Sequence, residues 1–99
     1  MRGQSSPTLD EVREVLLPVL LRHGIKRAGL FGSLVRGELR PRSDVDLAVE
    51  IMAPMSLFDF VGLKLELEEA LGRKVDLVEY EAIKPRIRDH VLSEHVPIL

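Results

Sequence analysis

Three aspartates in this sequence have the spacing of a metal-binding carboxylate cluster. Asp44 and Asp46 are separated by one residue in the segment DVDLAVE, whose alternating apolar residues predict a buried strand. Because side chains alternate along a strand, both carboxylates are expected to point to one face of the sheet. Asp76 lies in a second segment of this kind, residues 74–80. If the two strands are neighbours, all three carboxylates converge on one face.

The chemistry that suits such a cluster is phosphoryl transfer assisted by metal ions. Like charges this close repel unless a cation lies between them, and Mg²⁺ prefers carboxylate and phosphate oxygens. Three carboxylates can hold two ions about 4 Å apart for an in-line displacement. The alternative is structural, since Ser43 and Asp44 also suit a turn and Asp76 alone is typical of a strand surface. For the DVD pattern in isolation, the structural interpretation is favoured.

A Gly-Ser turn precedes the first two aspartates. Gly32 and Ser33 follow an expected strand over residues 25–31 and open a short helical turn. Free N–H groups at a helix start favour an anion, and glycine lets a phosphate approach the backbone. Guanidinium groups suit phosphate oxygens, although at least one of the arginines that follow is expected to be a solvated loop residue. These arginines are Arg36, Arg40 and Arg42.

Several classes of protein are excluded by the sequence. Gly32 and Gly37 have the spacing of a P-loop, but Glu38 and Leu39 follow where that loop needs Lys and Ser or Thr. With no cysteine, there is no disulfide, zinc-thiolate site or thiol nucleophile. A net charge of −2 gives no reason to expect direct nucleic-acid binding. No signal core or membrane span is visible, so we expect a cytoplasmic protein.

The elements that must position these residues predict an α/β domain. The 99 residues suit one domain over residues 8–99, after a flexible N-terminal tail over residues 1–7. Capping residues at Thr8 and Ser56 predict helices ending near residues 23 and 71, and a last helix is expected over residues 84–94. With the three strands they give a two-layer α/β (α+β) fold, in which helices pack on a short mixed sheet of three to four strands. Residues 95–99 are expected to be an extended edge segment.

Helical spacing also predicts which side chains face the core. In the second helix the expected inward stripe is Leu57, Val61, Leu65 and Leu71. In the last helix it is Ile87, Val91 and Leu92. Phe58, Phe60 and the C-terminal HVPIL segment are candidates for a partner-facing surface, but core packing is the expected role for all of them.

Taken together, Gly32, Ser33, Asp44 and Asp46 form the pattern GS-x10-D-x-D. In this context of strand, turn, linker and strand, the sequence resembles the minimal nucleotidyltransferase family. These proteins are small members of the polymerase-beta-like nucleotidyltransferase superfamily. The resemblance covers residues 9–99 and is most specific over LFGSLVRGELRPRSDVDLAVE. The segment GRKVDLVEY supplies the third acidic strand of the superfamily, and so the resemblance implies the nucleotidyltransferase fold.

The resemblance implies a catalytic role for each aspartate. Asp44 and Asp46 would ligate two Mg²⁺ ions. Asp76 would ligate the ion nearer the attacking hydroxyl and help to lower the pKa of that hydroxyl. The implied reaction is transfer of a nucleoside monophosphate, AMP from ATP, with release of pyrophosphate.

The resemblance also implies nucleotide contacts and a partner. Gly32 and Ser33 would hold the β- and γ-phosphates, and Arg36 would contact the triphosphate. Because the chain ends about twenty residues after Asp76, we expect another chain to supply the acceptor surface. Minimal nucleotidyltransferases pair with HEPN-domain ribonuclease toxins, act as the antitoxin and modify a toxin tyrosine with AMP.

Two alternatives stay open at this point. One is a small-molecule nucleotidyltransferase of the antibiotic-modifying kind, with an acceptor pocket at a homodimer interface. The other is a non-catalytic module that binds the toxin without turnover. Modification of a small alcohol or amine by the isolated chain would favour the first, and toxin neutralisation that survives loss of Asp44 would favour the second.

Overall fold

The structure, a computed structural model, describes residues 7–40 and 43–99. The helices are α1 (Leu9–Arg22), α2 (Ser33–Arg36), α3 (Leu57–Leu71) and α4 (Pro85–Glu94), with a short 3₁₀ helix, η1 (Tyr80–Ala82). The strands are β1 (Ala28–Phe31), β2 (Val45–Val49), β3 (Val75–Glu79) and β4 (Val96–Pro97). The expected N-terminal tail, apart from Pro7, and the candidate phosphate ligand Arg42 lie outside the described residues.

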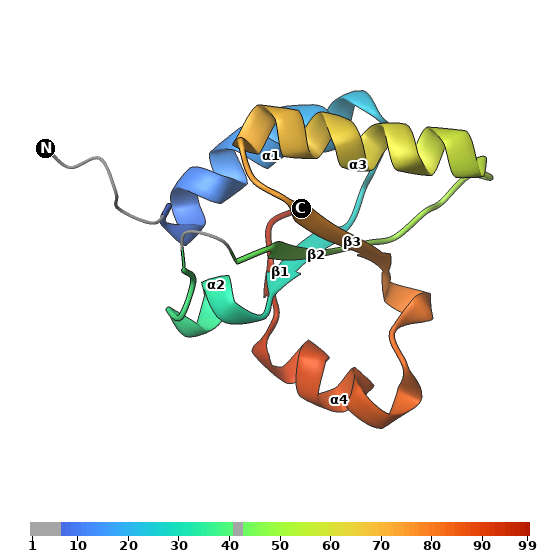
Figure 1. The fold of residues 1–99 in the computed structure, drawn as a ribbon. Coiled ribbons are helices and arrows are strands. Elements are labelled where there is room, and N and C mark those ends of the chain that lie inside the picture. Colours follow the sequence, from blue (N-terminus) through green and yellow to red (C-terminus); the bar gives the residue numbers. More distant parts are fainter. Residues whose placement is uncertain (1–6, 41–42) are drawn as a thin grey trace, which may run out of the picture.

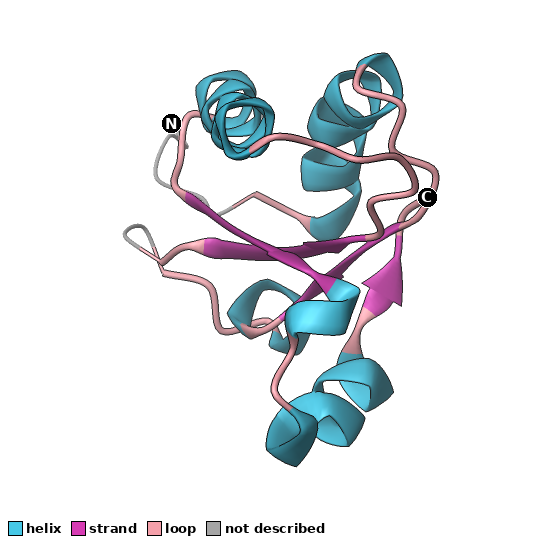
Figure 2. Cartoon of the chain, turned by 90° about the vertical axis from the view of Figure 1, so that its right-hand side faces the viewer, coloured by secondary structure: helices cyan, strands magenta, loops and turns pink. Residues whose placement is uncertain are grey.

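The four strands form one mixed sheet in the order β3-β2-β1-β4. Strand β1 pairs antiparallel with β2 and β4, whereas β2 and β3 are parallel. A parallel pair cannot be closed by a tight turn, and α3 provides the long crossover between β2 and β3. The prediction of an α/β fold with helices on a short mixed sheet is therefore confirmed. Helices lie on both faces of the sheet, however, and not in the single layer that the prediction of two layers requires (Figure 1 and Figure 2).

Helices cover the two faces of the sheet unequally. Helices α1 and α3 lie side by side on one face, and α2 and α4 lie on the other (Figure 1 and Figure 2). In β2, Val45, Leu47 and Val49 point toward α1 and α3 and belong to the main core. Ala48 points the other way, into a small cluster with Tyr80, Ile83 and Val91. This second face also receives Asp46, because residues two apart on a strand share a face.

Capping interactions set the starts of the two long helices, as the sequence predicts. The Thr8 hydroxyl accepts a hydrogen bond from the Glu11 N–H at 3.1 Å, and the Thr8 N–H donates to the Glu11 carboxylate at 2.8 Å. The Ser56 hydroxyl accepts from the Asp59 N–H at 3.0 Å. Each cap satisfies N–H groups that a helix start otherwise leaves without a partner.

The predicted inward stripe of α3 is wrong. Leu57, Val61 and Leu65 are exposed, as is Phe58 at 90%, whereas Leu63 and Leu67 are fully buried. Of the expected residues only Leu71 packs against the core, together with Phe60. The helix carries apolar residues on more than one side, so periodicity alone could not identify the stripe that the β2–α3 loop turns toward the sheet.

Two smaller differences concern the sheet and α4. The strand expected from residue 25 begins at Ala28. In α4, Val91 is buried as predicted, but Ile87 is 48% exposed. The C-terminal segment packs as expected, since β4 pairs with β1 and Ile98 is buried in the main core.

Among the described residues, no helix is long and apolar enough to cross a membrane.

The corrected orientation of α3 can be tested with two leucines on that helix. We expect Leu67→Ala to lower the free energy of unfolding by about 2–5 kcal/mol, because it leaves a cavity in the core. Leu65→Ala is the matched control and should change it by less than about 0.5 kcal/mol, because Leu65 is 56% exposed. Urea denaturation of both variants measures the difference. Similar losses in the two variants would contradict the orientation of α3.

Candidate active site

The parallel pairing of β2 and β3 brings two of the three predicted aspartates together. Asp46 and Asp76 are register partners across the two strands. Their side chains therefore leave the same face of the sheet, the one that α4 covers only in part. Asp44 is exposed and lies immediately before β2, two residues from Asp46. The expectation that Asp76 lies on a strand beside Asp46 is confirmed.

The electrostatics of Asp46 show how tightly negative charge is gathered here. Burial, followed by the charge and close approach of Asp76 and the charge of Asp44, raises the pKa of Asp46 to about 6. The Arg36 guanidinium acts in the opposite direction but does not offset these effects. The usual pKa of an aspartate is about 3.9, well below neutral pH. The raised pKa of Asp46 shows that folding places this carboxyl group where its ionised form is disfavoured.

Gly32 lies directly against the carboxylate of Asp46. Its backbone has φ +79° and ψ −150°, a conformation open essentially to glycine alone. A Cβ atom at this position would overlap Oδ2 of Asp46. The Gly-Ser turn and the aspartates are thus parts of one site, and a glycine is required at residue 32 by its backbone and by its neighbour.

The same turn is engaged by a residue that the sequence analysis missed, Glu94 at the end of α4. Its Oε1 accepts a hydrogen bond from the Gly32 N–H at 3.2 Å and another from Arg36 Nη1 at 3.0 Å. Arg36 also donates from Nε to Glu38 at 3.0 Å, and this bond, with the charge of Glu94, raises the pKa of Arg36. Ser33, the first residue of α2, is half-buried beside Gly32.

Arg73 holds the segment that leads to Asp44 and was also missed from the sequence. Its Nη1 donates to the carbonyl oxygens of Arg40 and Ser43 at 2.9 and 3.0 Å. The side chain of Arg40 is exposed. Arg73 is a positioning residue, since it reaches the backbone of the loop and not the aspartates. No pattern in the sequence indicates a contact between residues thirty or more positions apart.

The carboxylates have the donor chemistry for Mg²⁺, which takes oxygen ligands at a site of concentrated negative charge. A cation between Asp46 and Asp76 would relieve the repulsion that raises the pKa of Asp46. In residues 7–40 and 43–99, no three His, Asp or Glu side chains already stand close enough together to hold one ion. The residues present therefore fit a metal whose coordination is completed by oxygens of a substrate.

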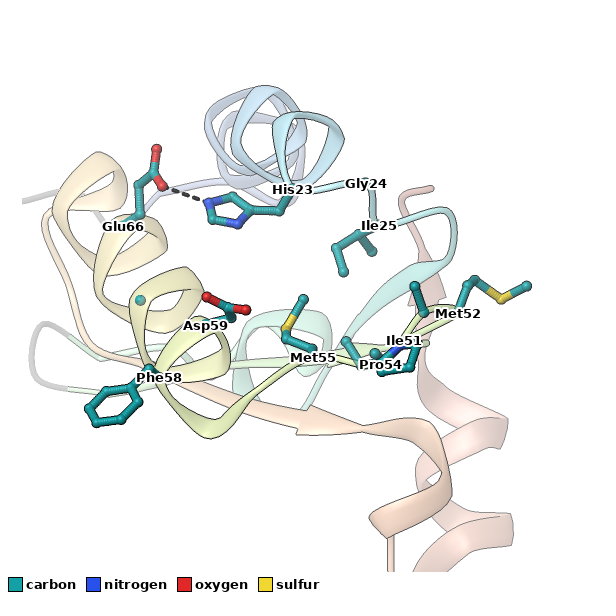
Figure 3. Close-up of a pocket in the computed structure, with 12 residues that line it drawn as sticks. His23, Gly24, Ile25, Ile51, Met52, Pro54, Met55, Phe58, Asp59 and Glu66 are labelled. Carbon is teal, nitrogen blue, oxygen red and sulfur yellow. Dashed lines mark hydrogen bonds and ion pairs between the residues drawn. The ribbon is translucent and has the colours of Figure 1, made fainter.

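A pocket of about 390 Å³ lies elsewhere on the molecule, between the end of α1, the β2–α3 loop and α3 (Figure 3). His23 contacts Glu66 at 2.7 Å on its wall, and Asp59 and Met55 point into it. The aspartates of the candidate site do not line this pocket. The cavity is consequently separate from the acidic site, and the acidic face itself is open.

Comparisons with known proteins identify several relatives. Residues 14–99 match the family model of polymerase beta nucleotidyltransferases. The protein adenylyltransferase MntA of Thermococcus cleftensis is 40% identical over 93 residues, which cover 90% of this chain and 94% of that protein. A solved structure provisionally described as a minimal nucleotidyltransferase is 42% identical and superimposes with a TM-score of 0.79, covering 94% of this chain and 98% of the other.

A more distant likeness extends to the fold alone. The structure is that of an MNT antitoxin in complex with a tri-AMPylated HEPN toxin of Shewanella oneidensis. The matched chain is 20% identical, with a TM-score of 0.69 and coverage of 89% of this chain and 69% of that one.

Alanine at residue 32 tests the contact between Gly32 and Asp46. We expect Gly32→Ala to lower the free energy of unfolding by about 3 kcal/mol, from backbone strain and overlap with the carboxylate. The control is Gly37→Ala, at φ +74° with nothing within 4 Å of the added atom, which should cost about 1 kcal/mol. Denaturant unfolding measures both. In an Asp46→Ala background the cost of Gly32→Ala should fall, and an unchanged cost would contradict the contact.

The pKa of Asp46 predicts how stability depends on pH. Because folding raises this pKa to about 6, the contribution of Asp46 to stability is complete below about pH 4 and is lost as the pH rises through 6. As the pH rises from 4 to 7.5, the free energy of unfolding of Asp46→Asn should therefore increase by about 1 kcal/mol relative to that of the wild type. This figure allows for solvent screening of a half-buried group. Urea unfolding in metal-free buffer measures this gain. Asp59→Asn is the control, and an equal gain in that variant would contradict the assignment.

Proposed function

Since the chain belongs to the polymerase beta nucleotidyltransferase family and is a nucleotidyltransferase, we propose that it transfers AMP from ATP to a tyrosine hydroxyl of a HEPN-type ribonuclease toxin and so acts as its antitoxin. The resemblance to the minimal nucleotidyltransferases is confirmed by these relatives. The observation that carries the proposal is the register of Asp46 with Asp76 beside the Gly32 turn. An acidic pair and an anion-binding turn on one sheet face are what a metal-assisted nucleotidyl transfer needs.

Each residue of the site has a role in this proposal. Asp44, Asp46 and Asp76 would hold two Mg²⁺ ions. When bound, these ions would neutralise negative charge at the α-phosphate. The Gly32 N–H and Ser33 bind the terminal phosphates, because amide groups at a helix start attract anions, as the contact of the Gly32 N–H with the Glu94 carboxylate illustrates.

Arg36 adds a guanidinium at the other end of the same helical turn and contacts the triphosphate. Asp76 is exposed, so it can meet the hydroxyl of an incoming acceptor and help to lower its pKa. Together these residues orient the donor phosphates and the acceptor for in-line transfer with loss of pyrophosphate.

The acceptor is proposed to come from another protein because the acidic face is open. The relative from Thermococcus cleftensis is named a protein adenylyltransferase, and the antitoxin from Shewanella oneidensis was solved with a toxin that carries AMP. Asp44 and Asp76 are exposed, and exposed carboxylates suit a side chain presented by a partner better than a free small molecule, which is bound in a concave pocket. We place the reaction in the cytoplasm.

Transfer of labelled phosphate tests the proposal. With ATP labelled at the α-phosphate, Mg²⁺ and a HEPN-type partner protein, label should move onto a tyrosine of that protein. Asp44→Asn/Asp46→Asn should lose at least about 10³-fold in rate, because it removes two ligands for the metal ions. Asp59→Asn, on the opposite face of the sheet, is the matched control and should retain wild-type activity. Chelation of Mg²⁺ should abolish transfer.

Other outcomes would favour the two remaining candidates. Label on a small alcohol or amine, with none on the HEPN protein, would support an antibiotic-type nucleotidyltransferase. If no label moves and the double variant still silences the toxin, the chain is a binding module. Label that moves equally well with the double variant would contradict the assignment of the site.

A further inference from the structure

Glu94 occupies the anion-binding groups of the candidate site with its own carboxylate. A single oxygen, Oε1, accepts from both the Gly32 N–H and Arg36 Nη1, at 3.2 and 3.0 Å. These two donors belong to the set proposed above to bind the terminal phosphates of the nucleotide. Gly32 lies 62 positions and Arg36 58 positions before Glu94 in the sequence, so the contact depends on how α4 packs.

The location of Glu94 is unfavourable for α4 itself. Glu94 is the last residue of the helix, where the macrodipole disfavours a negative charge. Its side chain is nevertheless only 17% exposed, and its other oxygen lies 3.8 Å from His90. The contact with Gly32 and Arg36 accounts for a carboxylate held at this end of the helix.

Helix α4 has attachments to the sheet besides Glu94. Val91 is buried in the small cluster beside Ala48, and Leu92 packs against that cluster. Arg88 ties the start of the helix to η1 through the carbonyl oxygens of Tyr80, Glu81 and Ile83. Strand β4 pairs with β1 directly after α4, so the helix is anchored at both ends and the group free to move is the Glu94 side chain.

We propose that Glu94 is an internal competitor of the nucleotide, which must leave Gly32 and Arg36 before the terminal phosphates bind. This inference rests on the proposed function and deepens it by naming what controls access to the site. Gly32 has one N–H, which cannot serve Glu94 and a phosphate oxygen fully at the same time. A triphosphate beside Glu94 would also meet like charge in a half-buried place. The Glu94 carboxylate is consequently an internal ligand of the site that ATP displaces.

Binding of MgATP tests the competition directly. Measured by titration calorimetry on the full chain, Glu94→Gln should bind MgATP about fivefold more tightly or better, because the competing charged acceptor is gone. Glu94→Asp, whose carboxylate is one methylene shorter, should show a smaller gain. Glu69 is exposed on α3, far from the site, and Glu69→Gln makes the same chemical change there. This variant should bind MgATP as tightly as the wild type does. Circular dichroism checks that each variant is folded.

Hydrogen exchange supplies a second measurement that a merely structural role would not change. In the wild type, MgATP should speed amide exchange in the last turn of α4, because the Glu94 contact that holds this turn is lost as the nucleotide binds. In Glu94→Gln these amides should already exchange faster without nucleotide and change little on its addition.

The outcomes separate this inference from the proposed function. If Glu94→Gln binds MgATP equally or more weakly while the wild type still transfers AMP, Glu94 orients Arg36 and the competition is overturned. If neither protein binds MgATP, both the proposed function and the competition are overturned. Tighter binding by Glu94→Gln, with faster exchange in the last turn of α4, supports the competition.

Discussion

The parallel pairing of β2 with β3 is the constraint on which the rest of this structure depends. It sets Asp46 opposite Asp76 and so creates the acidic pair. A parallel pair requires a long crossover, and α3 supplies it while burying Leu63 and Leu67 on the far face of the sheet. The carbonyl of Lys74 accepts from the Val45 N–H at 2.9 Å, and Glu68 accepts from the Val75 N–H at 3.0 Å, so the register is also held where both strands begin. The buried apolar side chains on one face of β2 therefore hold Asp46 beside Asp76 on the other face, although the two carboxylates repel each other.

That repulsion is a property of the fold and not of a flexible surface. Asp46 is held between the backbone of Gly32 and the carboxyl of Asp76, and its pKa near 6 reflects burial and neighbouring charge. The backbone of β2 cannot move Asp46 to the other face without also turning its buried residues to the wrong face. The protein consequently carries an electrostatic cost that a cation can relieve, which links the chemistry of the site to the packing of the core on the other face.

Much of this arrangement could be predicted from the sequence, because it follows from local rules. Alternation in DVDLAVE assigned Asp46 to one face and Leu47 to the other, and the caps at Thr8 and Ser56 set the helix starts correctly. The stripe of α3 could not be predicted, since leucines occur around the helix and only the docked loop decides which of them is buried. Glu94 was missed for a similar reason. A glutamate at a helix end has no local signature, and its partner Gly32 is 62 residues away.

Gly32 is the point at which these local and distant effects meet. On one side its missing side chain makes room for the Asp46 carboxylate, and on the other its N–H donates to Glu94. A negative group thus lies on each side of one backbone unit, with Arg36 as the cation shared between them. Removing Glu94 from this arrangement would leave Arg36 and the Gly32 N–H as a positive edge beside an acidic pair. A magnesium–triphosphate complex offers anionic oxygens to Arg36 and the Gly32 N–H, and a cation to the acidic pair. Its charges therefore match the site only after the Glu94 carboxylate has left these donors.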